Sequence, residues 1–354
     1  FIKTSSIEVL LTIMMVSILG GIMKHYKILD KIVENILILI PNKKMILMIL
    51  PALIGILTIP GGALLSAPFI YDLGEEMNIP PRRRAVINLV FRHIAMLLMP
   101  YSTGLLLIAA TIPNLNMMKI ISNNLLFVVP VILVGYLMFI RNIKSEKNDD
   151  TSKRTKKSVY NLTILTLPIY ICVIINIVTG LPLYMTMIIS ILAVYFLSNK
   201  IDFVKTTIKS ISWQTIIMVI AILIMKEIIL KMDDLLLIFN NLIKESTNIL
   251  SILFVLFIAS VFFGFITGNQ TTSLAIMLPM VSQLQISEEI MYIYVYFTFT
   301  SAFFGYFFSP LHLCQAFTVQ RMNISTLDLY KEYKYYILFM IIILFVSVCL
   351  IIAI

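Results

Sequence analysis

The chain has 354 residues, of which 60% are hydrophobic and 13% charged, and its mean hydropathy is +1.00. This composition excludes a soluble globular protein, which needs a far more polar surface. The formal net charge of +9 does not indicate nucleic-acid binding, because most Lys and Arg stand in short clusters between apolar runs, as in cytoplasmic loops. Cys172, Cys314 and Cys349 lie in apolar segments without disulfide or zinc spacing, and we expect all three to act as small apolar residues.

The first part of the chain contains five apolar or amphipathic runs. A membrane-spanning helix needs about 20 mostly apolar residues, and its backbone polar groups must be paired internally or shielded by protein. In chain order we expect a span over Ser6–Met23, an interfacial amphipathic helix over Ile28–Ile40, interrupted runs over Met45–Tyr71 and Ala85–Ile112, and a closing span over Asn116–Ile140. The interruptions are Thr58–Gly62 and Met99–Gly104.

The second part follows a polar, charged stretch, Arg141–Lys157, which we predict to be a cytoplasmic linker. In chain order we then expect plain spans over Val159–Ile177 and Pro182–Leu197, an interfacial stretch over Ile201–Ser212, a span over Trp213–Leu230, an amphipathic piece over Asp233–Ile243, interrupted runs over Ile249–Pro279 and Ile290–Val319, and a final span over Tyr335–Ile354. These interruptions are Thr267–Thr272 and Ser309–His312.

The interruptions recur at a nearly constant offset, which indicates an internal repeat. Gly55–Thr58 is echoed 209 residues later by Gly264–Thr267, and Met99-Pro100 is echoed 210 residues later by Ser309-Pro310. We therefore divide the chain into a first repeat over 1–140, a linker over 141–157 and a second repeat over 158–354. The second repeat has two spans, within 159–197, that the first lacks, so we expect further residues upstream of Phe1.

The distribution of positive charge predicts how the two repeats are oriented. With the linker in the cytoplasm, 21 of the 27 Lys and Arg fall on the cytoplasmic side and five on the other side. Corresponding spans then run in opposite directions. The predicted fold is an all-α polytopic membrane protein, an inverted-topology repeat with two re-entrant hairpins and two broken helices, in the cytoplasmic membrane.

The interruptions are the predicted site. Non-helical backbone at membrane depth is tolerated only inside protein or beside a water-filled cavity, and exposed helix N-termini favour an anionic group. The alternative is that these are ordinary structural kinks with Ser and Thr bonded to their own helices. The candidate substrate-binding residues are Thr58, Gly61, Gly62, Ser66, Arg92, Tyr101, Ser102, Thr103, Thr267, Asn269, Gln270, Thr271, Thr272, Ser309 and His312, and the candidate Na⁺ ligands are Thr58, Gly61, Thr267, Asn269 and Thr271.

Arg92 is the most informative single residue, because it is the one Arg or Lys that the charge count assigns to neither side of the membrane. Either its side chain extends to the cytoplasmic edge, or it meets an anionic substrate group or a hairpin carbonyl. His93 is expected to be a packed histidine, whereas His312, on the second break, is the candidate for substrate contact or proton coupling. We find no Asp or Glu deep within the predicted spans, which favours an anionic cargo over a cationic one.

Three segments carry a resemblance to a known group of membrane proteins: Thr58–Pro68, Phe91-Arg92-His93 and Gly264–Gly268. They resemble the ion transporter superfamily of arsenite, citrate, dicarboxylate and gluconate carriers, and within it the uncharacterised family called domain of unknown function 401. The resemblance implies inverted repeats, often in a homodimer, an elevator-like mechanism, and coupling to Na⁺ or H⁺. Sodium-coupled dicarboxylate relatives carry Ser-Asn-Thr at each hairpin tip, a pattern that Pro60-Gly61-Gly62 and Asn269–Thr272 do not reproduce.

The expected function is secondary active transport of a small anionic solute, organic or inorganic, by alternating access and with ion or proton coupling. The expected surroundings are membrane lipid, without nucleic acid and without a cofactor other than the coupling ion. A passive channel for small solutes stays open as an alternative. An intramembrane hydrolase is disfavoured, because three scattered histidines supply no His-Glu-x-x-His pair and a Ser309–His312 dyad lacks a nucleophile elbow.

Overall fold

The computed structural model describes residues 4–56, 63–144, 156–245 and 249–353. Within these ranges every regular element is a helix, which confirms the all-α class. Seven helical segments are long and apolar enough to cross a bilayer: Thr4–His25, Pro81–Thr111, Met117–Ile140, Lys156–Thr179, Ile249–Thr267, Glu288–Phe307 and Thr326–Ala353. A pair bent by 41°, Phe203–Lys209 with Trp213–Ile229, would make an eighth. These lengths and compositions are those of a multi-pass membrane protein.

The described residues of the first part of the chain form eight α-helices and one π-helical turn. Its elements are α1 (Thr4–His25), α2 (Ile28–Leu39), α3 (Lys43–Ile56), α4 (Ala63–Glu76), α5 (Pro81–His93), α6 (Ala95–Leu98), α7 (Thr103–Thr111) and α8 (Met117–Gly135), the last continuing into the π-helical turn η1 (Tyr136–Ile140). The break between α6 and α7 lies within the predicted interruption at Met99–Gly104. Thr58–Gly62 lies outside the described residues.

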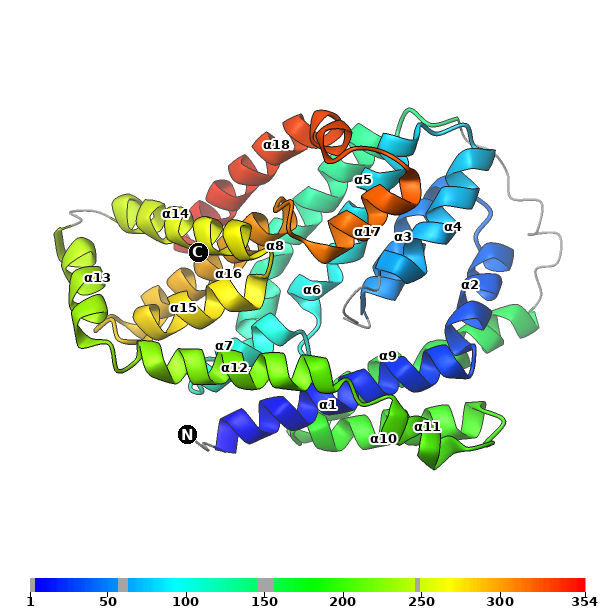
Figure 1. Ribbon diagram of the computed structural model, residues 1–354, viewed down its shortest axis with the longest axis horizontal. Coiled ribbons are helices and arrows are strands. Elements are labelled where there is room, and N and C mark those ends of the chain that lie inside the picture. Colours follow the sequence, from blue (N-terminus) through cyan, green and yellow to red (C-terminus); the bar gives the residue numbers. More distant parts are fainter. Residues whose placement is uncertain (1–3, 57–62, 145–155, 246–248, 354) are drawn as a thin grey trace.

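The second part begins with α9 (Lys156–Thr179), α10 (Leu183–Leu197) and α11 (Phe203–Lys209). It continues with α12 (Trp213–Ile229), α13 (Asp233–Glu245), α14 (Ile249–Thr267), α15 (Gln270–Ser282), α16 (Glu288–Phe307), α17 (Leu313–Met322) and α18 (Thr326–Ala353). The breaks between α14 and α15 and between α16 and α17 fall within the predicted interruptions. In Figure 1 the α3–α4 pair and the α14–α15 pair lie on opposite sides of α5, α6 and α17.

Helix length distinguishes the α3–α4 pair from the α14–α15 pair. α3 and α4 have 14 residues each, which at roughly 1.5 Å per residue is about 21 Å, too short to cross a hydrocarbon core of about 30 Å. α15 is also short, with 13 residues. α14 has 19 residues and qualifies as a span on its own. The second pair therefore has one long and one short arm, unlike the first.

Burial separates inner helices from outer ones. In the most apolar 18 residues of the α16 segment, 83% of the residues are buried, and in those of the segment that contains α5 the share is 67%. In α9 it is 17%. The α16 segment also has the lowest hydropathy of the seven, because other helices rather than lipid surround it. α5 and α16 thus form the centre of the bundle, and both end beside the helix breaks.

Lys226 and Glu227 differ from the expectation that charged side chains stay out of the spans. Both lie inside α12, and Lys226, one of the five cations that the charge count placed on the outer side, is 1% exposed. Its Nζ is 3.1 Å from Glu227 Oε1 and 3.4 Å from the carbonyl oxygen of Ala110, at the end of α7. An adjacent carboxylate and the negative end of a helix both stabilise a buried ammonium.

Candidate functional site

A cavity of about 160 Å³ lies where the helix breaks meet. It is lined by Gly55, Arg92, Met96, Ser102, Thr103, Met218, Gly268, Asn269, Gln270, Thr271, Tyr306, His312, Leu313 and Cys314. These residues come from α3, α5, α6, α7 and from α12, α14–α15, α16 and α17, so both parts of the chain contribute. None of the described lining residues carries a carboxylate.

Seven of the fifteen predicted site residues line this cavity: Arg92, Ser102, Thr103, Asn269, Gln270, Thr271 and His312. Five others are described but are not among its lining residues: Ser66, Tyr101, Thr267, Thr272 and Ser309. Thr58, Gly61 and Gly62 lie outside the described residues. The structure thus brings together one residue of α5 and the residues at the start of α7, α15 and α17.

Three helices begin at the cavity wall. Thr103, Gln270 and Leu313 are the first residues of α7, α15 and α17, and all three line the cavity. The first N–H groups of a helix have no partner within the helix, and the aligned peptide dipoles make that end positive. Three such ends around one small volume give it a positive potential without any ionised side chain.

Arg92 adds a full positive charge to the same volume. Its side chain is buried, with 4% of the residue exposed, so it does not extend to the surface of the protein. Nη1 donates to Sγ of Cys314 over 3.1 Å and lies 3.4 Å from Nε2 of His93. The guanidinium is therefore held beside the cavity by two neighbours from different helices.

Gly55 brings α3 against the backbone of α5 at this point. A Cβ on Gly55 would lie 1.9 Å from the carbonyl oxygen of Arg92, a distance that no side chain can occupy. Only glycine permits this close approach of two helices. The glycine therefore fixes α3 against the residue that carries the buried charge. Sequence analysis noted Gly55 as part of the repeat but did not predict this contact.

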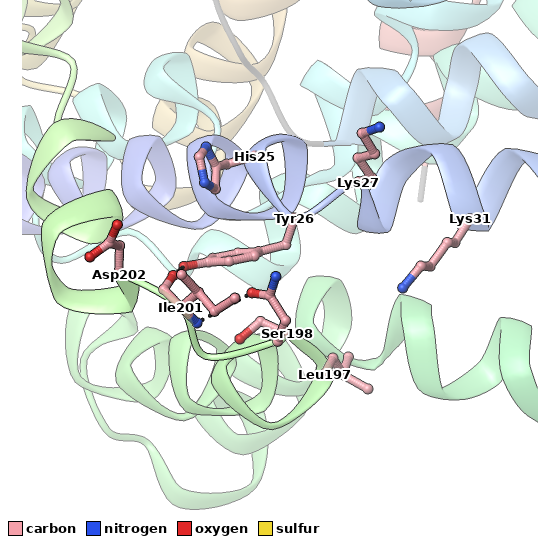
Figure 2. A pocket seen from close by; sticks show the side chains of 9 residues that line it. His25, Tyr26, Lys27, Lys31, Leu197, Ser198, Ile201 and Asp202 are labelled. Atoms are coloured by element: carbon pink, nitrogen blue, oxygen red, sulfur yellow. Dashed lines mark hydrogen bonds between the residues drawn. The ribbon is translucent and has the colours of Figure 1, made fainter.

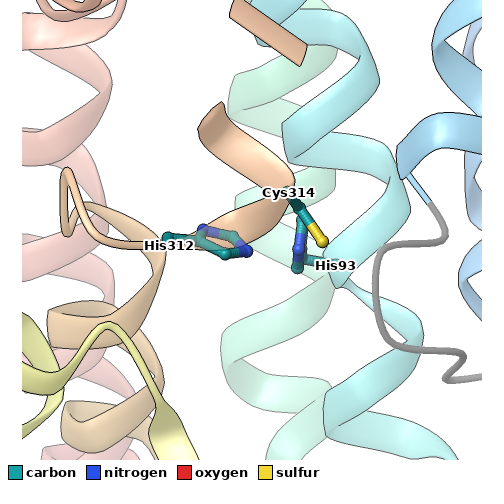
Figure 3. Close-up of side chains that lie close together, drawn as sticks. All are labelled: His93, His312 and Cys314. Carbon is teal, nitrogen blue, oxygen red and sulfur yellow. The ribbon is translucent and has the colours of Figure 1, made fainter. Parts of the chain in front are cut away.

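His93, His312 and Cys314 form a compact cluster at the edge of the cavity (Figure 3). The two imidazole rings are 4.7 Å apart, centroid to centroid, and nearly perpendicular at 79°. His93 is completely buried, as expected for a packed histidine, and His312 is 1% exposed. Cys314 was expected to be a small apolar residue, but its sulfur accepts a hydrogen bond from Arg92. A signal was present in the sequence, since Cys314 stands two residues after His312 at a helix break.

Sequence comparison assigns the chain to a family. The profile of a family described as "Protein of unknown function (DUF401)" matches residues 2–353. The chain belongs to this family. No curated protein matches the sequence. The family description states no activity, so the function must be argued from the site.

Of the predicted Na⁺ ligands, Thr267, Asn269 and Thr271 are described and lie at the break between α14 and α15, whereas Thr58 and Gly61 lie outside the described residues. Asn269 Oδ1 caps α15 by accepting from the amide N–H groups of Thr271 and Thr272, over 2.8 and 3.3 Å. Gly268 provides the preceding turn with φ +59°, a conformation that suits glycine. The Thr267 hydroxyl is exposed and donates to the carbonyl of Phe263 over 2.7 Å. Local helix termination accounts for these three residues.

Ser66, Tyr101 and Ser309 are buried outside the cavity wall. Ser309 Oγ donates to the carbonyl of Phe265 over 2.5 Å and so joins the end of α16 to the end of α14. Tyr101 packs in the apolar cluster formed by α1, α2, α3, α9 and α10. The Ser309 hydroxyl thus bonds to the backbone of a different helix and not to its own.

A larger cavity of about 300 Å³ lies elsewhere, between the α1–α2 turn and the α10–α11 loop (Figure 2). Its lining includes His25, Lys27, Lys31 and Asp202, and Tyr26 donates from its hydroxyl to the carbonyl of Ile201 over 2.7 Å. Lys27, Lys31 and Asp202 are exposed. It is a surface recess with ordinary solvated charges and carries no buried charge of the kind that Arg92 provides.

Proposed function

We propose that this protein is a secondary active transporter for a small anionic solute, and that the cavity beside Arg92 is the solute site. The observation that carries the proposal is the coincidence of one buried guanidinium and three helix N-termini at a cavity whose described lining contains no carboxylate. A negative charge close to a buried positive charge lowers the cost of burying it. An anion in the cavity would supply a negative charge beside Arg92.

The residue types around the cavity favour an anion in a second way. Guanidinium and helix-terminal N–H groups donate hydrogen bonds and cannot accept them, and such charge-assisted bonds to carboxylate or phosphate oxygens are the strong ones. Ser102 Oγ is buried and has no hydrogen-bond partner among the described residues. Its hydroxyl group is placed to donate a hydrogen bond to an oxygen atom of a solute.

The transport mechanism belongs to the same proposal. The succession long helix, amphipathic helix, helix pair, broken helix and final helix occurs in α1–α8 and again in α12–α18. With the asymmetry of Lys and Arg, this order supports an inverted repeat whose paired helices are re-entrant, and alternating access around a midplane site. Membership in the wider ion transporter superfamily, residence in the cytoplasmic membrane, assembly as a homodimer, coupling to Na⁺ or H⁺ and the absence of enzymatic activity are further parts of the proposal.

The test is uptake and binding by the purified protein in proteoliposomes. Candidate organic and inorganic anions would each be measured with no gradient, with a Na⁺ gradient and with a proton gradient. We expect at least one anion to accumulate above its external concentration when a gradient is imposed. If no anion binds or crosses above the level of protein-free liposomes under any gradient, the proposal is wrong. Flux that only equilibrates the two sides under every gradient would instead identify a passive channel.

A further inference from the structure

The cluster of His93, His312 and Cys314 has a donor set that anion transport does not require. One ligand atom from each side chain lies within 4.8 Å of the other two, and all three residues are buried. Figure 3 shows the side chains pointing toward one another, His93 from α5 and the other two from the start of α17. Two imidazoles and a thiol are ligands that zinc-like metals prefer.

Backbone carbonyls determine which imidazole nitrogens are available. His93 Nδ1 lies 2.7 Å from the carbonyl oxygen of Leu89, and His312 Nδ1 lies 3.4 Å from that of Phe307. A carbonyl only accepts, so each Nδ1 carries the proton and each Nε2 keeps its lone pair. A backbone carbonyl on the far nitrogen is the usual partner of a metal-ligating histidine. His312 Nε2 is buried without a hydrogen-bond partner among the described residues, which leaves a lone pair directed at the cluster.

The geometry points to a site for a thiophilic d¹⁰ cation, with Zn²⁺ as its representative, held by His93 Nε2, His312 Nε2 and the Cys314 thiolate. Zinc bonds of about 2.0 Å to nitrogen and about 2.3 Å to sulfur place tetrahedral donors roughly 3.3 to 3.6 Å apart. Closing the cluster to that size needs a contraction of about 1 Å, within the reach of side-chain rotation. The fourth position faces the cavity, where water or solute completes the tetrahedron.

Metal binding at this site requires that Arg92 give up its contacts with two of the ligands. Its Nη1 contacts Cys314 Sγ and His93 Nε2, two of the three metal ligands. The guanidinium and the metal therefore compete for the same electron pairs, and their positive charges repel one another. Metal binding displaces the Arg92 side chain from its neighbours. The metal site stands on its own geometry and does not depend on the proposed transport function, although a displaced Arg92 would alter that site.

Metal binding can be measured without any transport assay. Zn²⁺ would be titrated into the purified full-length protein in detergent in competition with a chromophoric chelator, and Co²⁺ would be added as a spectroscopic substitute. We expect one Zn²⁺ per chain and a thiolate-to-Co²⁺ charge-transfer band with tetrahedral d–d absorption. Cys314→Ser should remove the band and weaken Zn²⁺ binding by more than the roughly 10–100-fold that loss of an outer-shell partner costs. Cys172→Ser, at a buried cysteine elsewhere, and Cys349→Ser, at an exposed one, are the matched controls.

Arg92→Gln separates this inference from the proposed function. It should abolish anion transport and yet tighten Zn²⁺ binding by at least about tenfold, because a nearby like charge is removed. Zn²⁺ should also protect Cys314, but not Cys349, from alkylation in the unaltered chain, a measurement that needs no variant to fold. Equal Zn²⁺ binding by the wild type and Cys314→Ser, loss of binding in Cys172→Ser, a Co²⁺ spectrum without a sulfur band, or no protection of Cys314 would each overturn the site. Weaker Zn²⁺ binding by Arg92→Gln would contradict the inference that the guanidinium competes with Zn²⁺ for these ligands.

Discussion

Gly55 and Arg92 touch through their backbones: a Cβ on Gly55 would lie 1.9 Å from the carbonyl oxygen of Arg92. The same kind of contact joins α14 to α16, where a Cβ on Gly305 would lie 2.3 Å from the carbonyl oxygen of Val261. One helix of each pair, α3 or α14, is thus pressed against a central helix at a glycine. We regard these contacts as the means by which the helix breaks are held around the cavity.

Gly55→Ala should therefore disrupt the site. The added methyl group meets backbone rather than a movable side chain, so α3 must shift away from Arg92, and we expect a lower melting temperature and lost anion binding. Gly135→Ala is the control, because its Cβ would meet Val90 Cγ1 at 3.1 Å and a side chain can yield. In a helix interior, alanine is also favoured over glycine by about 1 kcal/mol. Thermal unfolding in detergent compares the two variants, and equal melting temperatures would contradict the contact.

Arg92→Gln should remove anion binding, and Arg92→Lys should retain only part of it. Lysine keeps the positive charge but lacks the planar guanidinium, whose Nη1 contacts both Cys314 and His93. Lys156→Gln, at an exposed cation at the start of α9, should leave binding unchanged. Binding of the transported anion to each purified variant is the measurement. Wild-type affinity in Arg92→Gln would show that the guanidinium is not part of the solute site.

The buried hydrogen bond from Asn88 Nδ2 to Thr318 Oγ1, over 3.0 Å, connects α5 to α17. A double-mutant cycle with Asn88→Ala and Thr318→Val should give a coupling free energy of about 0.6 kcal/mol, and at most about 1.7 kcal/mol, as for other hydrogen bonds between membrane helices. The free energies of unfolding of the four proteins provide this value. Additive losses would mean that the two side chains stabilise their helices separately.

Asn124 stabilises the break between α6 and α7. Its Nδ2 donates over 2.6 Å to the carbonyl oxygen of Leu97, which lies at the end of α6 where the helical hydrogen bonds stop. Asn124→Leu leaves that buried carbonyl without its partner and should cost about 1–3 kcal/mol of unfolding free energy. Asn123→Leu, at the neighbouring and less buried position, is the control. A loss in Asn123→Leu as large as that in Asn124→Leu would argue against a specific role for this bond.

Much of the architecture could be predicted because it depends on local composition. Apolar runs of membrane length, amphipathic pieces and breaks at Pro, Gly and Asn are properties of neighbouring residues, and the described helices follow the predicted order. The burial of Lys226 was not predicted. It depends on which helices surround the segment, and hydropathy of the segment does not contain that information.

The candidate site likewise has a part that the sequence predicted and a part that depends on the packing of helices. The sequence by itself singled out Arg92, His312 and the residues around Asn269 as polar groups at helix breaks. Only the tertiary structure decided that Arg92 would contact Cys314, 222 residues away in the sequence. That contact requires a particular rotation and depth of α5 and α17, which are determined by backbone contacts such as that of Gly55. A sequence pattern specifies which residues share a helix face, whereas the packing of whole helices determines which faces meet.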